Sequence, residues 1–503
     1  MFSDRFRVIR PSVFVISLTT VVILAVASLS SASDRLDPAL VPDSAVGRSF
    51  ATFFDMVVSE DQSRYTDFVQ GTLSAEIREE FGVEAIVRYL DHVHDPEDAW
   101  VVVGFRAGDD PNSLRAIIRT EHTAANHAFV YAINPDDPTS VSDIDMVPAG
   151  VPSEILDQRI GLREVVAEMN DYFRRLGGGD AFSGVVLLAQ GDKVIFEEAY
   201  GEASLRYDVP NAVDTRFSIG SITKLFTAAA IAKLIEEGKL SYEQPVGALL
   251  DQAWVGDAIG KQIELRHLLS HTGSTGNFQM HPDFQKAPMS IFRSLDAYAP
   301  FCRVDTLETK PGSQWQYSNT GFVLAGAMME VATGTDWFEY MRSRVYEPLQ
   351  LLDTDCFASD VPHRRLAEGY MEAPGGQWRS NTFFQRAMGC PAGSSYSTVR
   401  DLWRFARVLQ DGSFISKQSF ATMRTAHPDI GAERYGYGLE IHPTLDGKDA
   451  IGHSGGGPGV HAWLKILPEQ DVVMVMLANR GTAVNAVNQR LLEWLSRWDP
   501  EMK

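Results

Sequence analysis

The stretch that most constrains this fold is an apolar run that extends from Ser221 to Gly238. Alanine, isoleucine and leucine dominate it and a glycine closes it, so it predicts a helix that begins at or near Ser221 and stops at Gly238. Few charges interrupt its faces before the last turns, and a helix that is apolar on nearly every face is a buried one. The chain must therefore enclose this helix in a core, and its 503 residues are enough for about two to four domains.

Ser221 and Lys224 lie three residues apart, on one face at the start of this helix. A serine hydroxyl is a poor nucleophile unless a base lies beside it. A buried lysine can be that base, because burial disfavours its charged form; lowering its pKa by about 3, at a cost of about 4 kcal/mol, leaves it half neutral near pH 7. Ser-x-x-Lys is also frequent on solvated helices, so the pair indicates catalysis only together with other parts of a site.

Charge and cysteine content exclude some kinds of partner. The chain has 45 Lys and Arg against 66 Asp and Glu, a net charge of −21. This balance argues against binding to nucleic acid and to anionic lipid, which both attract a surplus of basic residues. An exported chain could pair two of its three cysteines, Cys302, Cys356 and Cys390, and the sequence does not indicate which. No metal site and no cofactor are expected.

Residues 1–32 have the features of an export signal. Basic residues precede an apolar run from Val13 to Leu29, and small residues at its end offer a cleavage site. A periplasmic or secreted location is therefore expected, with a linker at residues 33–43. Because the run is little shorter than the roughly 20 residues that span a bilayer, an uncleaved N-terminal membrane anchor is the alternative.

Residues 44–150 predict a small α+β domain. Helical periodicity up to His94 gives way to alternating runs separated by Asp-, Asn- and Pro-containing turns, which predict strands at 100–105, 114–118, 128–133 and, most weakly, 141–146. Helices followed by an antiparallel sheet form an α+β layer arrangement. The pattern resembles the small NTF2-like domains that precede some exported hydrolases. His92, His94 and Asp95 could be read as a metal site, but a solvated turn is the favoured interpretation.

Residues 155–499 predict a larger domain with strands at both of its ends. Helices are predicted at 155–176, 322–332, 399–409 and 484–498, and strands at 184–189, 193–199, 463–467 and 471–478. Because a stable sheet needs three or more strands, the early and late strands are expected to pair with one another. The buried helix at Ser221 then lies between the two halves of the sheet in the sequence.

Two further polar motifs accompany this helix. Tyr317-Ser318-Asn319 follows a Pro-Gly turn, and His453-Ser454-Gly455-Gly456 precedes the late strands. The second motif also matches the Gly-x-Ser-x-Gly elbow of α/β-hydrolases, but that fold needs a helix directly after the serine, whereas strands are predicted here. His267 and His271 could hold zinc on one helix face; a packed helix end is the favoured interpretation.

The three motifs in this order resemble the serine β-lactamase and penicillin-binding-protein-like superfamily, on its class C β-lactamase and esterase side. The resemblance covers roughly residues 160–500 and includes the flanking segments 217–220, 267–272, 311–312 and 435–438. It implies an α+β fold of the β-lactamase/transpeptidase type, in which helices flank a central antiparallel sheet and a helical subdomain is added.

The resemblance also implies the roles of individual residues. Ser221 would be the nucleophile, Lys224 its base or proton relay, and Tyr317 a further general base or acid. The backbone N–H groups of Ser221 and Gly456 would form the oxyanion hole.

Asn319, His453 and Gly455 would bind substrate. Members that act on β-lactams or peptidoglycan usually carry Lys-Thr/Ser-Gly at the third motif. His453 stands in place of that lysine, and a neutral imidazole is a weaker partner for a carboxylate.

This difference favours an exported serine hydrolase that acts on carboxylic esters or small amides without an adjacent carboxylate. A penicillin-binding protein, a β-lactamase or a D-aminopeptidase is the alternative, with a small molecule or a peptide as substrate. A non-catalytic sensing or binding protein on the same fold is the remaining interpretation.

Overall fold

The computed structural model describes residues 35–59, 62–93, 99–121, 123–177, 181–373, 377–481 and 484–502. The expected export signal lies outside these ranges, as do His94 and Asp95. None of the helices formed by the described residues combines the length and the apolar character that crossing a bilayer requires.

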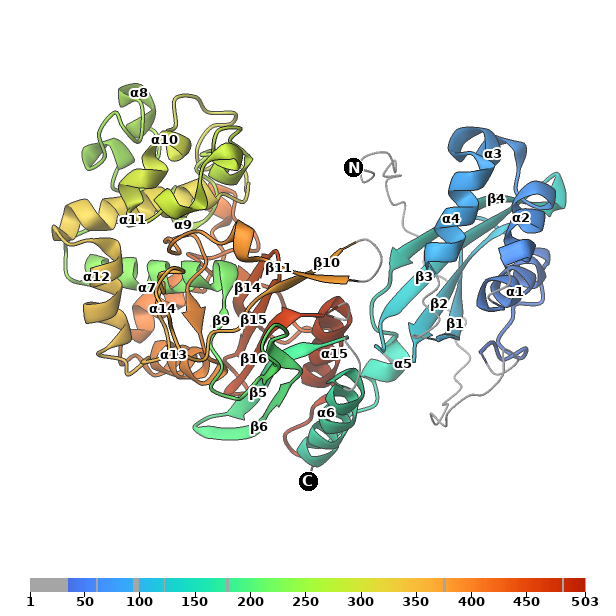
Figure 1. Ribbon diagram of the computed structural model, residues 1–503. Coiled ribbons are helices and arrows are strands. Elements are labelled where there is room, and N and C mark those ends of the chain that lie inside the picture. The colour runs from blue at the N-terminus through green and yellow to red at the C-terminus, as the bar shows by residue number, and fades with distance from the viewer. Residues whose placement is uncertain are drawn as a thin grey trace.

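The N-terminal region combines helices with a four-stranded antiparallel sheet (Figure 1). Its elements are α1 (Ala45–Val58), α2 (Gln62–Gly71), α3 (Ala75–Phe81), α4 (Val83–Val93), β1 (Trp100–Ala107), β2 (Ser113–Thr120), β3 (Asn126–Asn134) and β4 (Asp137–Pro148). Phe50 and Phe53 of α1 pack on Phe129 and Tyr131 of β3, which gives this region an aromatic core of its own. The predicted order of helices and strands is confirmed, and the NTF2-like identity stays a prediction.

The larger region is built on a six-stranded antiparallel sheet in the order β13-β14-β15-β16-β5-β6. The strands are β5 (Ser183–Gln190), β6 (Lys193–Tyr200), β13 (Glu440–Ile441), β14 (Ile451–Gly457), β15 (Val460–Leu467) and β16 (Val472–Arg480). Val475 of β16 lies opposite Leu187 of β5. The early and late strands therefore pair, as the sequence predicts.

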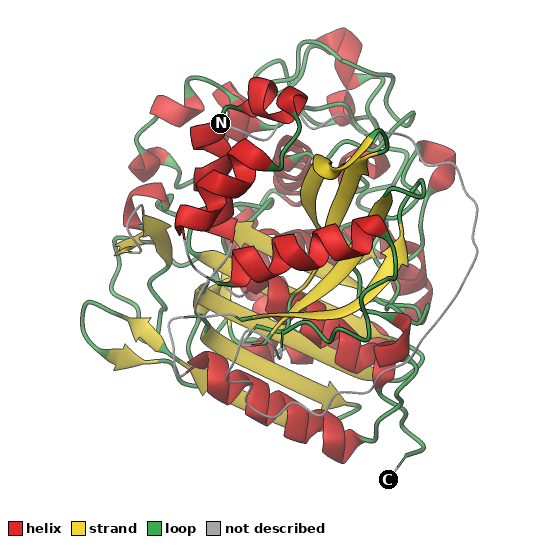
Figure 2. Cartoon of the chain, turned by 90° about the vertical axis from the view of Figure 1, so that its right-hand side faces the viewer, coloured by secondary structure: helices red, strands yellow, loops and turns green. Residues whose placement is uncertain are grey.

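Helices cover both faces of this sheet, as Figure 2 also shows. Successive side chains of a strand point to opposite faces. In β16, Val473 and Val475 therefore contribute to one core, whereas Met474 and Met476 contribute to the other. The second core contains residues of α6 (Leu162–Gly177) and α15 (Val484–Arg497), and the first contains residues of α7 (Thr223–Glu236) and α13 (Val399–Asp411).

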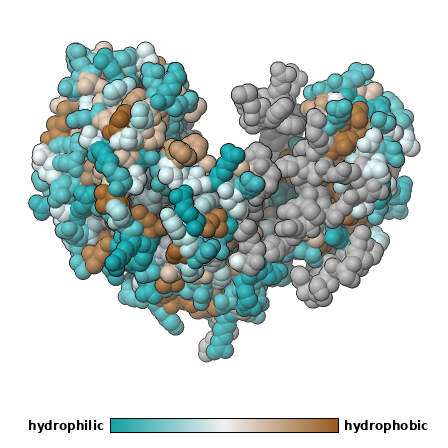
Figure 3. All heavy atoms as spheres, viewed as in Figure 1, coloured by the Kyte–Doolittle hydropathy of each residue, from teal (hydrophilic) through white to brown (hydrophobic). Residues whose placement is uncertain are grey.

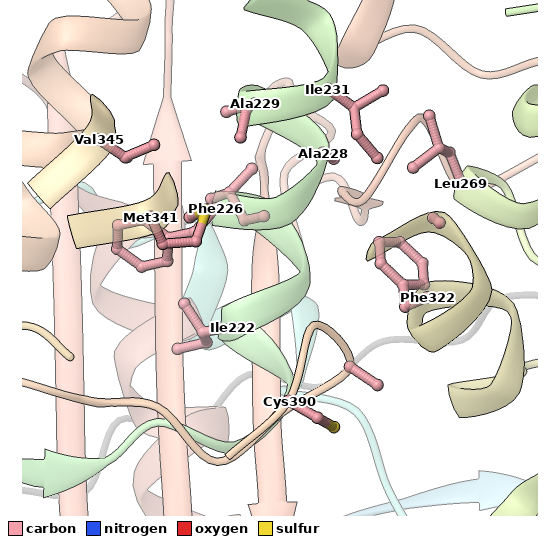
Figure 4. Close-up of a cluster of buried hydrophobic side chains, with 14 of the residues drawn as sticks. Ile222, Phe226, Ala228, Ala229, Ile231, Leu269, Phe322, Met341, Val345 and Cys390 are labelled. Carbon is pink, nitrogen blue, oxygen red and sulfur yellow. The ribbon is translucent and has the colours of Figure 1, made fainter. Parts of the chain in front are cut away.

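The apolar helix of the sequence is α7, and it is enclosed on several sides. A short 3₁₀ turn, Gly220–Ile222, precedes it, and Gly238 follows it with a positive φ of 69°. In Figure 4, Phe226 lies toward Met341 and Val345, while Phe322 and Leu269 lie on the other side of the helix. The prediction of a buried helix is confirmed, with Ser221 placed in the turn that leads into it.

The remaining elements complete the helical part and the connections. They are α8 (Asp257–Gly260), α9 (Leu265–Leu269), α10 (Ala299–Cys302), α11 (Asn319–Thr333), α12 (Trp337–Met341), α14 (Lys417–Met423), β7 (Glu202–Ser204), β8 (Val209–Pro210), β9 (Phe217–Ser218), β10 (Tyr370–Ala373), β11 (Gln377–Ser380) and β12 (Tyr396–Ser397). The face drawn in Figure 3 is mostly hydrophilic, and its hydrophobic residues lie in small separate groups.

One expectation needs correction, and one question that the sequence leaves open is answered. The single helix predicted at 155–176 is two helices, α5 (Ser153–Leu156) and α6, because the backbone of Ile160 between them pairs with Arg497 and Asp499 instead of continuing a helix. The cysteines form no disulfide: Cys302, Cys356 and Cys390 are all buried and free.

The close approach of β14 to the turn before α7 depends on glycine. A Cβ atom on Gly455 would lie 2.1 Å from the carbonyl oxygen of Ile219, whereas one on Gly456 would meet no atom within 4 Å. Gly220, which has a φ of +49°, faces the same contact, since its Cβ would lie 2.9 Å from the nitrogen of Gly456. Because glycine has no side chain, the strand can lie directly against the turn that carries Ser221.

The N-terminal region contacts the larger region through a buried carboxylate. Glu493 of α15 is 1% exposed. It forms ion pairs with Arg119 of β2 at 3.0 Å and with Arg497 at 3.0 Å, and a further one with Arg490. Glu168 is a second carboxylate partner of Arg490 and Arg497, so two negative charges face three guanidinium groups here, and Glu493 is the one that pairs with Arg119.

We expect Glu493→Ala to lower the free energy of unfolding by about 3–5 kcal/mol, because it leaves Arg119 without its carboxylate partner and leaves Arg490 and Arg497 with Glu168 alone. Urea denaturation measures the change. Arg174→Ala is the matched control: its ion pair with Asp171 is exposed and should be worth less than about 1 kcal/mol. Equal effects of the two substitutions would contradict the importance of the buried cluster.

Gly455→Ala should destabilise the protein and Gly456→Ala should not, although the two glycines are neighbours on one strand. The first substitution forces β14 away from Ile219, and overpacking of this kind costs about 1–3 kcal/mol. The thermal unfolding midpoints of the two variants provide the test. A similar midpoint for both would show that the close contact at Gly455 does not carry stability.

Candidate active site

Three side chains that are far apart in the sequence meet at the start of α7. Lys224 Nζ lies 3.0 Å from Ser221 Oγ, and the Tyr317 hydroxyl donates a hydrogen bond of 2.7 Å to the same oxygen. The helix places Ser221 and Lys224 one turn apart. Tyr317 comes from the loop immediately before α11. The structure thus brings together the three side chains that the sequence predicts to react.

Lys224 is completely buried, and burial lowers its pKa to about 7. Its amine donates hydrogen bonds to Asn319 Oδ1 at 2.7 Å and to the Ala392 carbonyl at 2.5 Å. No carboxylate of the described residues forms an ion pair with it. The amine is therefore held by neutral acceptors, which leave it free to lose its proton near neutral pH.

Asn319 connects Lys224 to the opposite wall of the site. Its amide nitrogen donates to Gln279 Oε1 at 2.8 Å and to Asn277 Oδ1 at 3.3 Å. Because its oxygen receives the Lys224 amine, both ends of the amide are fixed, and the position of Lys224 is fixed with them. Ser318, the N-cap of α11, accepts a hydrogen bond from the Gly321 N–H and so anchors the start of this helix.

Tyr317 keeps its proton at physiological pH. Burial raises the pKa of its hydroxyl to about 12, although the hydrogen bond to Ser221 opposes this shift. The ring of His271 lies against the Tyr317 ring with a centroid separation of 4.3 Å. Tyr317 is therefore a positioned hydrogen-bond donor in the resting site.

His271 supports this wall as a neutral imidazole. Its Nδ1 accepts the N–H of Ser318 at 3.1 Å, and burial lowers its pKa well below the usual range, an effect that Lys224 reinforces. Its Nε2 is buried without a hydrogen-bond partner among the described residues. The predicted packed helix end is confirmed for His267, whose Nδ1 accepts the N–H of Glu264, whereas the imidazole of His271 is only half satisfied.

His453 is buried, and both of its ring nitrogens are hydrogen-bonded within the protein. The residue is 1% exposed; its Nδ1 donates to the Ser454 carbonyl at 2.5 Å, and its Nε2 accepts from the Tyr435 hydroxyl at 2.8 Å. Burial lowers its pKa and outweighs the attraction of the nearby Glu440 carboxylate. This histidine is a neutral part of the core beneath β14.

A cavity of about 280 Å³ opens over Ser221. It is lined by Gly220, Ser221, Asn277, Phe278, Gln279, Tyr317, Asn319, Arg386, Cys390, Ala392, Gly393, Ser394 and Gly456. Of the predicted oxyanion and substrate-binding residues, Ser221, Gly456 and Asn319 line it, whereas His453 and Gly455 do not. The close packing of Gly455 on Ile219 is sufficient reason for a glycine at this position, and no role in substrate binding is needed to explain it.

The edge of β14 beside the cavity is open. Strand β13 pairs only with Ile451 and Gly452, so residues 453–457 have no partner strand on that side among the described residues. The other side of the strand pairs with β15 throughout. An extended substrate can therefore hydrogen-bond to this edge as an added strand.

Several parts of the site carry no signal in the sequence. The Ala392 carbonyl belongs to the backbone, which no residue type reveals. Gln279 lies in the short 3₁₀ turn Phe278–Met280, Arg386 lies in a loop and Glu440 begins β13, and none of the three belongs to a predicted motif.

The α/β-hydrolase interpretation of Gly452–Gly456 is wrong. Ser454 lies in the middle of β14, and strand β15 follows where an elbow would need a helix. Its hydroxyl donates to Glu440 Oε1 at 2.6 Å. A zinc interpretation of His267 and His271 has no support either, since the described residues contain no cluster of three or more metal-binding side chains.

Comparisons with known proteins agree with this geometry. The family model for Beta-lactamase matches residues 169–495. The chain is 25% identical over 335 residues to penicillin-binding protein 4* of Bacillus subtilis, covering 61% of this chain and 70% of that protein. It is 24% identical over 320 residues to the D-alanyl-D-alanine-carboxypeptidase/endopeptidase AmpH of Escherichia coli, covering 60% and 81%.

A solved structure shares the fold. The penicillin-binding protein of Bacillus halodurans superposes with a TM-score of 0.57 at 26% identity, covering 66% of this chain and 99% of that one. The N-terminal helices and their four-stranded sheet lie outside the residues that the family model matches. The chain thus belongs to the Beta-lactamase family, and it is a serine hydrolase of that family.

Proposed function

We propose that this enzyme hydrolyses carboxylic esters or small amides through an acyl-enzyme on Ser221. The observation that carries the proposal is the double contact at Ser221 Oγ, with the Lys224 amine at 3.0 Å and the Tyr317 hydroxyl at 2.7 Å. The Lys224 amine can remove a proton from the Ser221 hydroxyl, and the Tyr317 hydroxyl can donate one. Acyl transfer needs both functions beside a single hydroxyl.

The hydrogen-bond capacity of Lys224 assigns the direction of proton transfer. A neutral amine has two N–H donors and one lone pair. Asn319 Oδ1 and the Ala392 carbonyl can only accept, so they take the two donors. The lone pair is then left for the proton of Ser221. Lys224 would accept this proton as the hydroxyl oxygen attacks the carbonyl carbon of the substrate.

Tyr317 would act with its proton in place. With a pKa of about 12 it is not a standing phenolate at neutral pH. Its hydroxyl would pass a proton to the leaving group while it receives one from Lys224, and the reverse transfer would activate water for deacylation. The backbone N–H groups of Ser221 and Gly456, which both line the cavity, would stabilise the oxyanion.

The buried state of His453 supports substrates without a carboxylate next to the scissile bond. A neutral imidazole whose two nitrogens are both occupied offers no cation to such a group. The names of relatives, which include a D-alanyl-D-alanine carboxypeptidase and a penicillin-binding protein, favour a peptide as the second candidate. Stable labelling by a fluorescent penicillin without turnover of short acyl esters would support that candidate.

An exported location is part of the proposal, on the basis of the arginines and the apolar run within residues 1–32. Fractionation of cells that express the full chain and a chain without these residues tests it.

A fluorophosphonate probe should label the wild-type protein and should fail to label Ser221→Ala, because the probe needs an activated hydroxyl. Ser454→Ala is the matched control: its hydroxyl bonds only to Glu440 among the described residues, so its labelling should persist. Gel fluorescence and mass spectrometry of the labelled peptide provide the measurement. Unchanged labelling of Ser221→Ala, or none of the wild type, would refute the proposed nucleophile.

The rate should depend on the protonation of Lys224. Because the neutral amine is the active form, kcat/KM for an uncharged 4-nitrophenyl ester should rise with pH through about 7 and then level off, since Tyr317 keeps its proton. Lys224→Met should lower kcat/KM by about 10²–10⁴-fold. Lys233→Met, on the same helix but partly exposed, should retain it. A rate that is flat with pH between 5 and 9, where an amine of pKa near 7 must titrate, would contradict this role.

A further inference from the structure

Among the described residues that line the cavity above Ser221, Arg386 is the one with a charged side chain. It follows the short turn Thr382–Phe384, and hydrogen bonds at the next two residues fix its backbone. The N–H of Ala387 donates to the Met289 carbonyl at 2.9 Å, and that of Met388 donates to the Phe292 carbonyl at 3.1 Å. The guanidinium is therefore presented from an anchored segment.

The guanidinium of Arg386 has few partners. Nη2 donates to Ser394 Oγ at 2.7 Å, and the group lies over the Phe278 ring at 6.0 Å. Nε is buried without a hydrogen-bond partner, and none of the described carboxylates forms an ion pair with this residue. A guanidinium offers five N–H donors. Most of its capacity is therefore unused in the described structure.

Two other arginines of this chain, one partly buried and one buried, are paired with carboxylates. Arg216 forms an ion pair with Asp353 at 2.5 Å, and Arg497 forms one with Glu168 at 3.1 Å. Buried charges are usually compensated because their desolvation is costly. An uncompensated cation at the wall of a reactive cavity indicates that its counter-ion arrives with the ligand.

The rest of the cavity wall suits an anion. No aspartate or glutamate is among its described lining residues, and Asn277 and Gln279 add amide groups near Asn319. A planar guanidinium can bind a carboxylate through two parallel hydrogen bonds. The wall therefore combines a fixed positive charge with neutral polar groups and presents no competing negative charge.

We infer that Arg386 binds a carboxylate of the substrate, so that the enzyme prefers esters or amides that carry an acidic group away from the scissile bond. This inference rests on the proposed acyl transfer at Ser221. In this inference Arg386 binds the substrate carboxylate, because His453 is buried and neutral and cannot bind it. Arg386 is also one of the positive charges that help lower the pKa of Lys224, after burial, which is the main cause; a bound carboxylate would offset that effect.

Two matched ester pairs test the inference. In the first, the 4-nitrophenyl monoester of adipic acid is compared with its methyl ester, which removes the charge from the acyl part. In the second, 3-acetoxybenzoate is compared with methyl 3-acetoxybenzoate, which removes the charge from the leaving part. The readout is the ratio of kcat/KM for the charged and the neutral member, and this ratio cancels changes in Lys224 that affect both.

Wild type should favour the charged member of at least one pair. Arg386→Gln should lower that ratio by about 10–100-fold, the range expected for a hydrogen-bonded charge pair. Arg386→Lys should recover part of it, because it keeps the charge but not the planar fork. Arg293→Gln, which alters an exposed arginine paired with Asp360, is the matched control and should leave the ratio unchanged.

A measurement on wild type alone covers the case in which the variants do not fold. Free adipate should slow fluorophosphonate labelling of Ser221, and the uncharged adipamide should not. Any one of three results would overturn the inference. Wild type could have the same kcat/KM for charged and neutral esters, Arg386→Gln could leave the ratio unchanged, or adipate and adipamide could slow labelling equally. If labelling of Ser221 is present in these cases, only the role of Arg386 fails; if labelling itself is absent, the proposed function fails.

Discussion

The structure depends on keeping one amine out of water. Lys224 lies on the buried helix α7, completely enclosed, with its pKa lowered to about 7. Burying a charged ammonium would cost several kcal/mol, so the fold has to favour the neutral form. It does so by surrounding Lys224 with acceptors that carry no charge, namely Asn319 Oδ1 and the Ala392 carbonyl.

The imidazoles nearby follow the same logic. His271 and His453 are both buried and both have lowered pKa values, so neither adds a stable positive charge beside Lys224. Their nitrogens hold Ser318, Ser454 and Tyr435 in place instead. The histidine that replaces the lysine of the third motif is thus better explained as a support for β14 than as a group that faces the substrate. A cation for the substrate is available at Arg386, which lines the cavity.

Close packing of the backbone completes the site. Gly220 and Gly455 let β14 lie against the turn that carries Ser221, and Gly456 then faces open space at the cavity. The same strand has a free edge beside the reactive groups and a fully paired edge toward β15. Gly455 and Gly456 are neighbours in the sequence, yet only Gly455 is required by this close packing, a difference that the glycine-rich sequence does not reveal.

The sequence by itself determined the elements whose cause is local. Apolar composition revealed α7, short continuous apolar runs revealed β5 and β16, and motif order revealed Ser221, Lys224 and Tyr317. Tertiary structure decided what depends on contacts across long separations. It broke the helix predicted at 155–176, because Ile160 bonds to the C-terminal segment, and it buried His453 against Tyr435, outside the residues that line the cavity. It also brought the Ala392 carbonyl and Arg386 to the site, since a carbonyl group is common to every residue and a lone arginine in a loop forms no pattern.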